Sequence, residues 1–175
     1  LWIDTQGSLF IYTPQDGKCR RIQVAGEPDK ILIVRSLAID SNGTVWLGTE
    51  YNGLGKVVKG EIVLGYGAAS KLRYASVRSL LVSTDHELYV GSTTGLMILN
   101  LQDERTADFF TTRNGLINNF IGCLLQDSNG HIWVGSNTCI SRYSRNQKLF
   151  YHYFLSGSNS SVCAYNRYLL WGNNR

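Results

Sequence analysis

A ten-residue pattern that recurs along the chain at a fixed interval constrains the fold more than any other feature of the sequence. Segments Asp40–Thr49 and Asp127–Ser136 share the order Asp-Ser-Asn-Gly, Trp and Gly, and Ser83–Ser92 is a diverged copy with Tyr in place of Trp. Intervals of 43 and 44 residues separate the three glycines that follow the aromatic residue, Gly48, Gly91 and Gly135. A period in the low forties, with about four strands per repeat, is typical of β-propeller blades.

Short apolar runs divide each repeat into strands, and no segment keeps the helical period of about 3.6 residues over three turns. We expect four strands in each of three complete repeats: Arg35–Asp40, Thr44–Thr49, Leu54–Lys59 and Glu61–Tyr66; Val77–Val82, Glu87–Ser92, Leu96–Asn100 and Ala107–Thr112; Ile121–Gln126, His131–Ser136, Ile140–Ser144 and Lys148–Phe154. Incomplete first and fifth repeats supply Leu1–Ile3, Leu9–Thr13 and Lys18–Val24, then Val162–Tyr165 and Tyr168–Trp171. The sequence therefore predicts an all-β fold of four-stranded antiparallel sheets. Residues 1–175 would belong to one propeller domain, with approximate units at 1–33, 34–76, 77–120, 121–160 and, in part, 161–175.

The repeated residues have expected structural roles. Gly43 and Gly130 should adopt positive φ in the turn between the first and second strands, where Asp40 and Asp127 can accept hydrogen bonds from turn amides. The glycine two residues after the aromatic ring lies on the same face of the sheet, so a neighbouring blade can approach its bare Cα. We expect large rings between adjacent blades, with glycines beside them: Trp46, Tyr89 and Trp133, and Gly48, Gly91 and Gly135.

Composition and motifs argue against several classes of function. Charged residues are 17% of the chain, the net charge is +4, and Lys and Arg do not cluster, so we expect no direct nucleic-acid binding. The four cysteines form no CxxC pair, and His86, His131 and His152 belong to no HExxH or Ser-His-Asp arrangement. We therefore expect no catalytic residues, no metal site and no cofactor in this segment. Its apolar runs are too short to cross a bilayer.

Residues Thr112–Ser136 resemble the two-component regulator propeller repeat, whose pattern runs from a Gly-Leu pair through an Asp-x-x-Gly turn to Trp-Ile-Gly-Thr. Val34–Leu54 and Val77–Leu96 match the later part of that pattern. The resemblance implies a partial arc of about four blades from a seven-bladed propeller, in the periplasmic sensor region of a Bacteroides-type hybrid two-component histidine kinase. It further implies a membrane-anchored parent protein that detects oligosaccharides and controls glycan-utilisation genes, of which this chain is an internal segment.

The loops of a propeller supply the candidate ligand contacts. Loops between the second and third strands, and loops between successive blades, emerge on one face, where ligands commonly bind. Aromatic rings stack on apolar sugar faces, and amide or guanidinium groups bind hydroxyls and carboxylates. Six loop residues have these properties: Tyr51, Asn52, Arg73, Tyr74, Arg113 and Asn119. Ordinary turn chemistry is the alternative explanation for each of them, above all for Asn119 and its neighbour Asn118.

Three functions remain open at this stage. The leading hypothesis is an oligosaccharide sensor. The first alternative is a propeller scaffold for protein–protein interaction or homodimerisation, which large exposed apolar patches and the lack of a concave polar pocket would favour. The second alternative is a propeller lyase or hydrolase, which would need a cluster of histidines or carboxylates at the axis.

Overall fold

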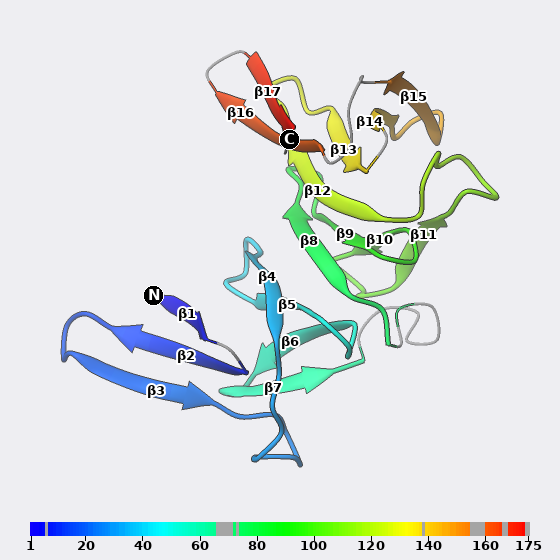
Figure 1. Cartoon of the computed structure of the whole chain (residues 1–175). Coiled ribbons are helices and arrows are strands. Elements are labelled where there is room, and N and C mark those ends of the chain that lie inside the picture. Colours follow the sequence, from blue (N-terminus) through cyan, green and yellow to red (C-terminus); the bar gives the residue numbers. More distant parts are fainter. Residues whose placement is uncertain are drawn as a thin grey trace.

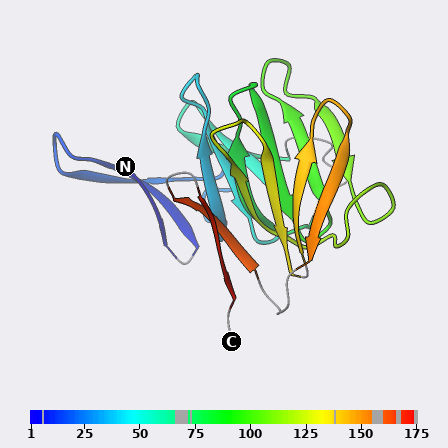
Figure 2. The same cartoon turned by 90° about the horizontal axis from the view of Figure 1, so that it is seen from above.

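The computed structural model describes residues 1–5, 7–65, 72, 74–137 and 139–154, with only the backbone described at 106–107, 160–165 and 168–173. The strands form five antiparallel sheets that stand side by side around an open arc (Figure 1). Figure 2 shows the strands side-on, so the arc has two faces, each built from the turns at one end of the strands. The predicted all-β propeller architecture is confirmed. No helix long and apolar enough to span a membrane occurs among these residues.

Three sheets have four strands in chain order, and we name them blades 2, 3 and 4. Blade 2 contains β4 (Val34–Ile39), β5 (Val45–Thr49), β6 (Leu54–Val58) and β7 (Glu61–Leu64). Blade 3 contains β8 (Val77–Val82), β9 (Glu87–Ser92), β10 (Leu96–Asn100) and β11 (Thr106–Phe110), and blade 4 contains β12 (Ile121–Gln126), β13 (Ile132–Ser136), β14 (Cys139–Ser144) and β15 (Leu149–Phe154). Blade 1 has β1 (Trp2–Thr5), β2 (Ser8–Thr13) and β3 (Lys18–Ile22), and blade 5 has β16 (Ser160–Tyr165) and β17 (Tyr168–Asn173).

The predicted strand bounds differ from the observed ones by two residues at most. Strands β8, β9, β10 and β12 have the bounds expected from the sequence. A turn glycine explains one of the larger shifts: β7 ends at Leu64 rather than Tyr66, because Gly65 has a φ of 89° and interrupts the extended backbone.

The first strands of blades 2 to 5 line the inner wall of the arc. Strand β4 contacts β8, β8 contacts β12, and β12 contacts β16, whereas the later strands lie progressively farther out (Figure 1). The first strand of each complete blade therefore lies nearest the propeller axis (Figure 1).

Buried rings fill the spaces between neighbouring blades, which we call seams. In seam 2/3, Trp46 belongs to one apolar cluster with Val77 and Leu88 of blade 3. In seam 3/4, Tyr89 belongs to one cluster with Ile121 of blade 4. Both rings are only 1% exposed, so the predicted wedging of these aromatics between blades is confirmed. Trp133 is half-buried and lies 5.7 Å, ring to ring, from Tyr153 of its own blade. The blade 5 side chains that would complete its seam lie outside the described residues.

Two of the repeat glycines allow the blades to approach closely. A Cβ added at Gly48 would lie 2.5 Å from Val77 Cγ1 and 2.8 Å from the Val77 carbonyl oxygen. A Cβ added at Gly91 would lie 2.7 Å from Ile121 Cγ2. Cβ atoms in proteins essentially never show contacts this short, so a side chain at either position would push two blades apart. Gly135, the third repeat glycine, is buried in blade 4.

The turn between the first and second strands has the predicted chemistry. Asp40 Oδ1 accepts hydrogen bonds from the backbone N–H groups of Asn42 and Thr44, both at 2.9 Å, and Asp40 Oδ2 accepts one from Trp46 Nε1 at 3.0 Å. Asp127 repeats this pattern in blade 4. The φ angles at this turn position are positive in all three blades, at 79°, 57° and 82° for Gly43, His86 and Gly130.

Candidate functional site

One face of the arc, which we call the loop face, carries the loops between second and third strands and the loops between blades. Backbone hydrogen bonds join the two kinds of loop. The Glu50 N–H donates to the Ile33 carbonyl at 2.9 Å, and the Thr93 N–H donates to the Ser76 carbonyl at 3.0 Å. Both kinds of loop therefore lie together, as the propeller interpretation predicts.

Glu50 is the charged centre of the loop face. Its carboxylate accepts hydrogen bonds from the Arg35 guanidinium and, at 3.2 Å, from the Ser76 hydroxyl. The hydrogen bond from Arg35 is the main reason that the pKa of Glu50 lies below its ordinary value, and the charge of Arg78 acts in the same direction. Because Arg35 lies in the first strand of blade 2 and Ser76 precedes blade 3, this cluster joins two neighbouring blades.

The exposed candidates of the loop face lie outside the two cavities described below. Tyr51 and Tyr74 are 63% and 73% exposed, and Arg113 is exposed on the loop between β11 and β12. Arg73 lies outside the described residues. None of the five predicted contacts within the described residues lines either of these cavities.

The asparagines of the loop face have local structural roles. Asn119 Oδ1 accepts a hydrogen bond from the Thr112 N–H at 2.7 Å, and Asn118 Oδ1 accepts one from the Phe120 N–H at 2.8 Å. Asn52 is half-buried, and its backbone N–H donates to the Thr49 hydroxyl. The side chains of Asn118 and Asn119 are thus engaged in loop geometry, which is the alternative that the sequence raised for them.

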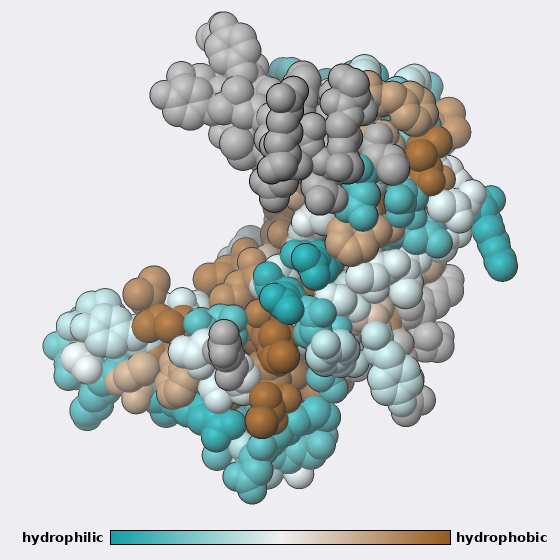
Figure 3. Space-filling model, viewed as in Figure 1, coloured by the Kyte–Doolittle hydropathy of each residue, from teal (hydrophilic) through white to brown (hydrophobic). Residues whose placement is uncertain are grey.

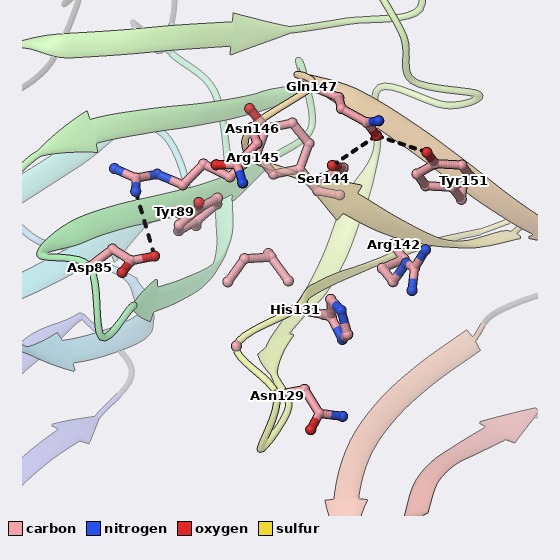
Figure 4. Close-up of a pocket in the computed structure, with 13 residues that line it drawn as sticks. Asp85, Tyr89, Asn129, His131, Arg142, Ser144, Arg145, Asn146, Gln147 and Tyr151 are labelled. Atoms are coloured by element: carbon pink, nitrogen blue, oxygen red, sulfur yellow. Dashed lines mark hydrogen bonds and ion pairs between the residues drawn. The ribbon is translucent and has the colours of Figure 1, made fainter.

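A groove of about 450 Å³ opens on the opposite face, which we call the turn face. It lies among the turn that precedes β9 in blade 3 and two turns of blade 4, those around residues 127–131 and 144–148 (Figure 4). A second cavity of about 300 Å³ adjoins it and shares Tyr143, Arg145 and Asn146. The side chains that give the groove its chemistry are Asp85, Asn129, His131, Arg142, Arg145, Gln147 and Tyr151.

An ionic contact across seam 3/4 forms one wall of the groove. Tyr89 donates its hydroxyl proton to Glu87 Oε2 at 2.9 Å, and Arg145 of blade 4 donates to Glu87 Oε1 at 2.8 Å. Arg145 also lies 3.6 Å from Asp85 (Figure 4). Glu87 is buried, so these partners compensate a carboxylate that would otherwise be costly to remove from water.

Burial and charge fix the protonation states in this wall. Burial, assisted by the Glu87 carboxylate, raises the pKa of Tyr89. Burial also raises the pKa of Tyr143 to about 12, and the hydrogen bond with Glu87 raises the pKa of Arg145 further above its ordinary value. Both tyrosines are therefore neutral and Arg145 is charged at neutral pH.

A second group of residues forms the opposite wall of the groove. The Arg142 guanidinium lies over the Tyr151 ring, 5.0 Å from the ring centroid. Gln147 Oε1 accepts hydrogen bonds from the Tyr151 hydroxyl at 2.8 Å and the Ser144 hydroxyl at 3.2 Å. The Tyr151 side chain is thus held by two contacts, a cation over its ring face and an amide oxygen at its hydroxyl.

His131 lies at the edge of the groove and contacts Asp127. His131 Nδ1 is 3.1 Å from Asp127 Oδ2, which also accepts the Trp133 Nε1–H bond. Burial alone would raise the pKa of Asp127, but the hydrogen bonds from Trp133 and His131 outweigh burial and lower it. Asp127 is therefore an ionised structural group that orients the histidine.

Sequence reasoning missed the groove because it assigned ligand contacts to the loop face. One feature of the sequence could have indicated the position of the groove. The turn between the third and fourth strands is a polar segment around Arg145-Asn146-Gln147 in blade 4, whereas in blade 2 it is only Lys59-Gly60.

The remaining histidines have separate surroundings. His152 Nδ1 lies 2.8 Å from the Ser141 hydroxyl in blade 4, and His86 occupies the tight turn of blade 3. Within the described residues, no group of three or more His, Cys, Asp or Glu side chains is arranged to hold a metal ion.

Comparison with known proteins agrees with this architecture. The sequence profile of the family described as "Two component regulator propeller" matches residues 30–51 and 115–138. These two matches cover the turn and second strand of blades 2 and 4, where the Asp–Trp hydrogen bond is found. None of the curated protein sequences compared with the chain matches it.

Several solved structures share the fold. The extracellular domain of the protein named as hybrid two-component system BT3049 of B. thetaiotaomicron superposes with a TM-score of 0.71 at 22% identity, over 93% of this chain and 22% of that one. PorZ, a surface component of the type-IX secretion system of Porphyromonas gingivalis, gives a TM-score of 0.56 at 22% identity, over 76% of this chain and 22% of that one. Virginiamycin B lyase from Staphylococcus aureus gives 0.61 at 14% identity, over 90% of this chain and 52% of that one.

These levels of identity establish a shared fold, and this chain spans well under two thirds of each of the three proteins. The profile matches, the phase of the repeat and the blade structure agree with one another. The chain is an arc of β-propeller blades, and segments of two of these blades match the two-component regulator propeller repeat.

Proposed function

We propose that this chain is part of the periplasmic sensor region of a membrane-anchored hybrid two-component signalling protein. In this role it detects oligosaccharides and relays the signal to a histidine kinase that controls glycan-utilisation genes. The segment itself is not an enzyme. The observation that carries the proposal is the match of two blades to the regulator propeller repeat, on a fold shared with the extracellular domain of a protein named as a hybrid two-component system.

The groove on the turn face supports direct ligand binding. It is concave and lined by arginines, amides and a tyrosine ring, which are groups that bind sugar hydroxyls and stack on sugar rings. A ligand in the groove would contact blades 3 and 4 together. It would therefore favour one arrangement of neighbouring blades over another, which is how binding can be passed to the rest of a sensor.

A scaffold for protein association or homodimerisation is the second candidate. The outermost strand of blade 4 exposes large apolar side chains, among them Leu149, Tyr153 and Phe154. Hydrophobic side chains gather at this corner of the molecule (Figure 3). An exposed apolar patch of this kind is a frequent feature of association surfaces.

The test is a thermal-shift screen of the purified chain against a panel of neutral and acidic oligosaccharides. Because a ligand that binds only the folded state stabilises it, we expect at least one saccharide to raise Tm in a concentration-dependent way. No shift across a broad panel would contradict direct sensing by this segment. Light scattering of the same sample tests the second candidate: a concentration-dependent dimer, abolished by Phe154→Ser, would favour association.

A further inference from the structure

The second cavity of the turn face, of about 300 Å³, lies within seam 3/4. The polar residues that line it in the described part of the chain belong to blades 3 and 4: Glu87, Asp108, Tyr143, Arg145, Asn146 and Lys148. The Tyr143 ring lies 5.3 Å, centroid to centroid, from Phe110 of blade 3, so this side chain faces the neighbouring blade. The walls of the cavity are therefore the facing surfaces of two complete four-stranded sheets.

Two ion pairs cross the seam at this cavity and arrange its charges by depth. Arg145 Nη2 lies 2.8 Å from Glu87 Oε1. Lys148 Nζ lies 2.8 Å from Asp108 Oδ1. The two carboxylate side chains are 10% and 24% exposed, whereas the two cationic side chains are 50% and 61% exposed. Negative charge therefore lies deep in the cavity, positive charge lies near its mouth, and the four charges sum to zero. An anionic ligand would meet the buried carboxylates, and a cationic ligand would meet the two cations at the entrance.

The Tyr143 hydroxyl is a polar group that the protein leaves open at this cavity. Tyr143 is only 3% exposed, yet no hydrogen bond within the described residues uses its hydroxyl. Ser79 Oγ is the only fully buried side-chain N or O atom of those residues that lacks a partner, so the Tyr143 hydroxyl must reach open space. Burial and the charges of Asp108 and Glu87 raise the pKa of Tyr143 to about 12, so this hydroxyl keeps its proton and can donate it.

Asp108 supplies an open acceptor in the same cavity. Its Oδ1 atom accepts the hydrogen bond from Lys148, and among the residues that the structure describes no hydrogen bond uses its Oδ2 atom. Ile98, which pairs with Asp108 between β10 and β11, adds an apolar side chain to the lining. A proton donor, a proton acceptor and an apolar surface together suit a neutral sugar ring, because its hydroxyls both donate and accept and its C–H groups are apolar.

We propose that this cavity binds one terminal ring of a neutral oligosaccharide. This inference rests on the proposed function and names the class of saccharide. One ring hydroxyl donates to Asp108 Oδ2, a neighbouring hydroxyl accepts from Tyr143, and a C–H face contacts Ile98. The volume of the cavity lies at the low end of ligand sites, which suits a single ring rather than a longer chain. Because the ring touches both blades, its binding stabilises seam 3/4.

The experiment is ligand-observed NMR titration of the chain with the methyl glycosides of glucose, galactose and mannose. Each neutral glycoside has two matched probes: the uronide, which carries a carboxylate in place of the hydroxymethyl group, and the amino sugar, which carries an ammonium group in place of a hydroxyl. We expect at least one neutral glycoside to bind about fivefold more tightly than both of its charged counterparts. Its affinity should not fall as salt increases, because the ligand forms no charge pair.

Tyr143→Phe tests the site directly, because it removes the hydroxyl and keeps the ring in the seam. It should weaken binding of the neutral glycoside about tenfold through the loss of one hydrogen bond. It should leave Tm of the free chain unchanged, since the hydroxyl has no partner within the described residues. Tyr51→Phe is the matched control: it removes the hydroxyl of an exposed ring on the loop face and should change neither the affinity nor Tm.

The other outcomes separate this inference from the proposed function. Tighter binding of a uronide or an amino sugar overturns the preference for a neutral ring. Binding that Tyr143→Phe leaves unchanged lies outside the cavity, and a Tm lowered by this variant means that the hydroxyl supports the fold; either result overturns the assignment. If no glycoside binds but the thermal-shift panel contains a ligand, this inference fails and the sensor proposal stands. Failure of every saccharide in both experiments contradicts both proposals.

Discussion

Blades 2 and 3 use different residues to accept hydrogen bonds from the turn between the first and second strands and from the buried seam ring. In blade 2 one carboxylate, Asp40, accepts hydrogen bonds from two turn amides and from the ring of Trp46. In blade 3 two residues share this role. The Ser83 hydroxyl accepts hydrogen bonds from the turn amides, and the Glu87 carboxylate accepts one from the Tyr89 hydroxyl. Moving the acid from the turn into the strand leaves one Glu87 oxygen available to Arg145 of the next blade. The blade that departs most from the repeat is therefore the one that forms a wall of the groove.

The largest expected effects come from removing the two seam rings. We expect Trp46→Ala and Tyr89→Ala each to lower the free energy of unfolding by about 3–5 kcal/mol, because each leaves a large cavity between blades. Urea denaturation measures this loss. The matched control is Tyr51→Ala, which removes a ring that is 63% exposed and should change stability by less than about 0.5 kcal/mol. A cost below about 1 kcal/mol for either seam ring would show that its seam is held by other contacts.

The glycines at the seams should give an intermediate effect that distinguishes the two seams. Gly48→Ala and Gly91→Ala are expected to cost about 1–3 kcal/mol each, through overpacking. Gly48→Ala should be the more costly, because its methyl group would meet the Val77 backbone oxygen, whereas at Gly91 the obstacles are the side chains of Ser79 and Ile121. Thermal unfolding compares the variants. Gly122→Ala is the control, because the nearest atom to its Cβ lies 3.6 Å away, and equal losses at all three positions would argue against close contact at the seams.

The smallest effect is a difference in acid sensitivity. The pKa values of Asp40 and Asp127 are lowered in the folded protein, because hydrogen bonds from Trp46 or Trp133 and from turn amides outweigh burial. Each carboxylate therefore stabilises the fold above its unfolded pKa of about 3.9, and this contribution is lost as the pH falls through the lower, folded value. Blade 3 has Ser83 at this position and should not share the effect.

Comparison of Tm between pH 7 and pH 3 checks this difference. The double variant Asp40→Asn/Asp127→Asn should start at a lower Tm and decline less steeply than the wild type. Ser83→Ala, at the same turn position in blade 3, should lower Tm without changing the slope. The same slope in all three proteins would mean that these two aspartates do not govern acid unfolding.

The fold was predictable because its determinants are local and repeated. Gly43, Asp40 and Trp46 lie within one turn and one strand, and their spacing alone indicates the hairpin, the positive φ and the buried ring. The groove depends instead on contacts between distant parts of the chain. Arg145 and Glu87 are 58 residues apart, and no pattern within a single repeat reveals that one reaches the other. The asparagines of the loop face show the converse: their composition suits sugar binding, but Asn119 Oδ1 is used by the Thr112 amide.

The cross-seam ion pairs limit how such a propeller can change its number of repeats. In blades 3 and 4 the turn between the third and fourth strands reaches back to the preceding blade. Glu104 of blade 3 binds Lys56 of blade 2, and Arg145 of blade 4 binds Glu87 of blade 3. Deletion of blade 3 would remove both Glu104 and Glu87, and would leave Lys56 and Arg145 without these partners. Loss of one whole repeat would therefore break two ion pairs even though the remaining repeats keep their pattern.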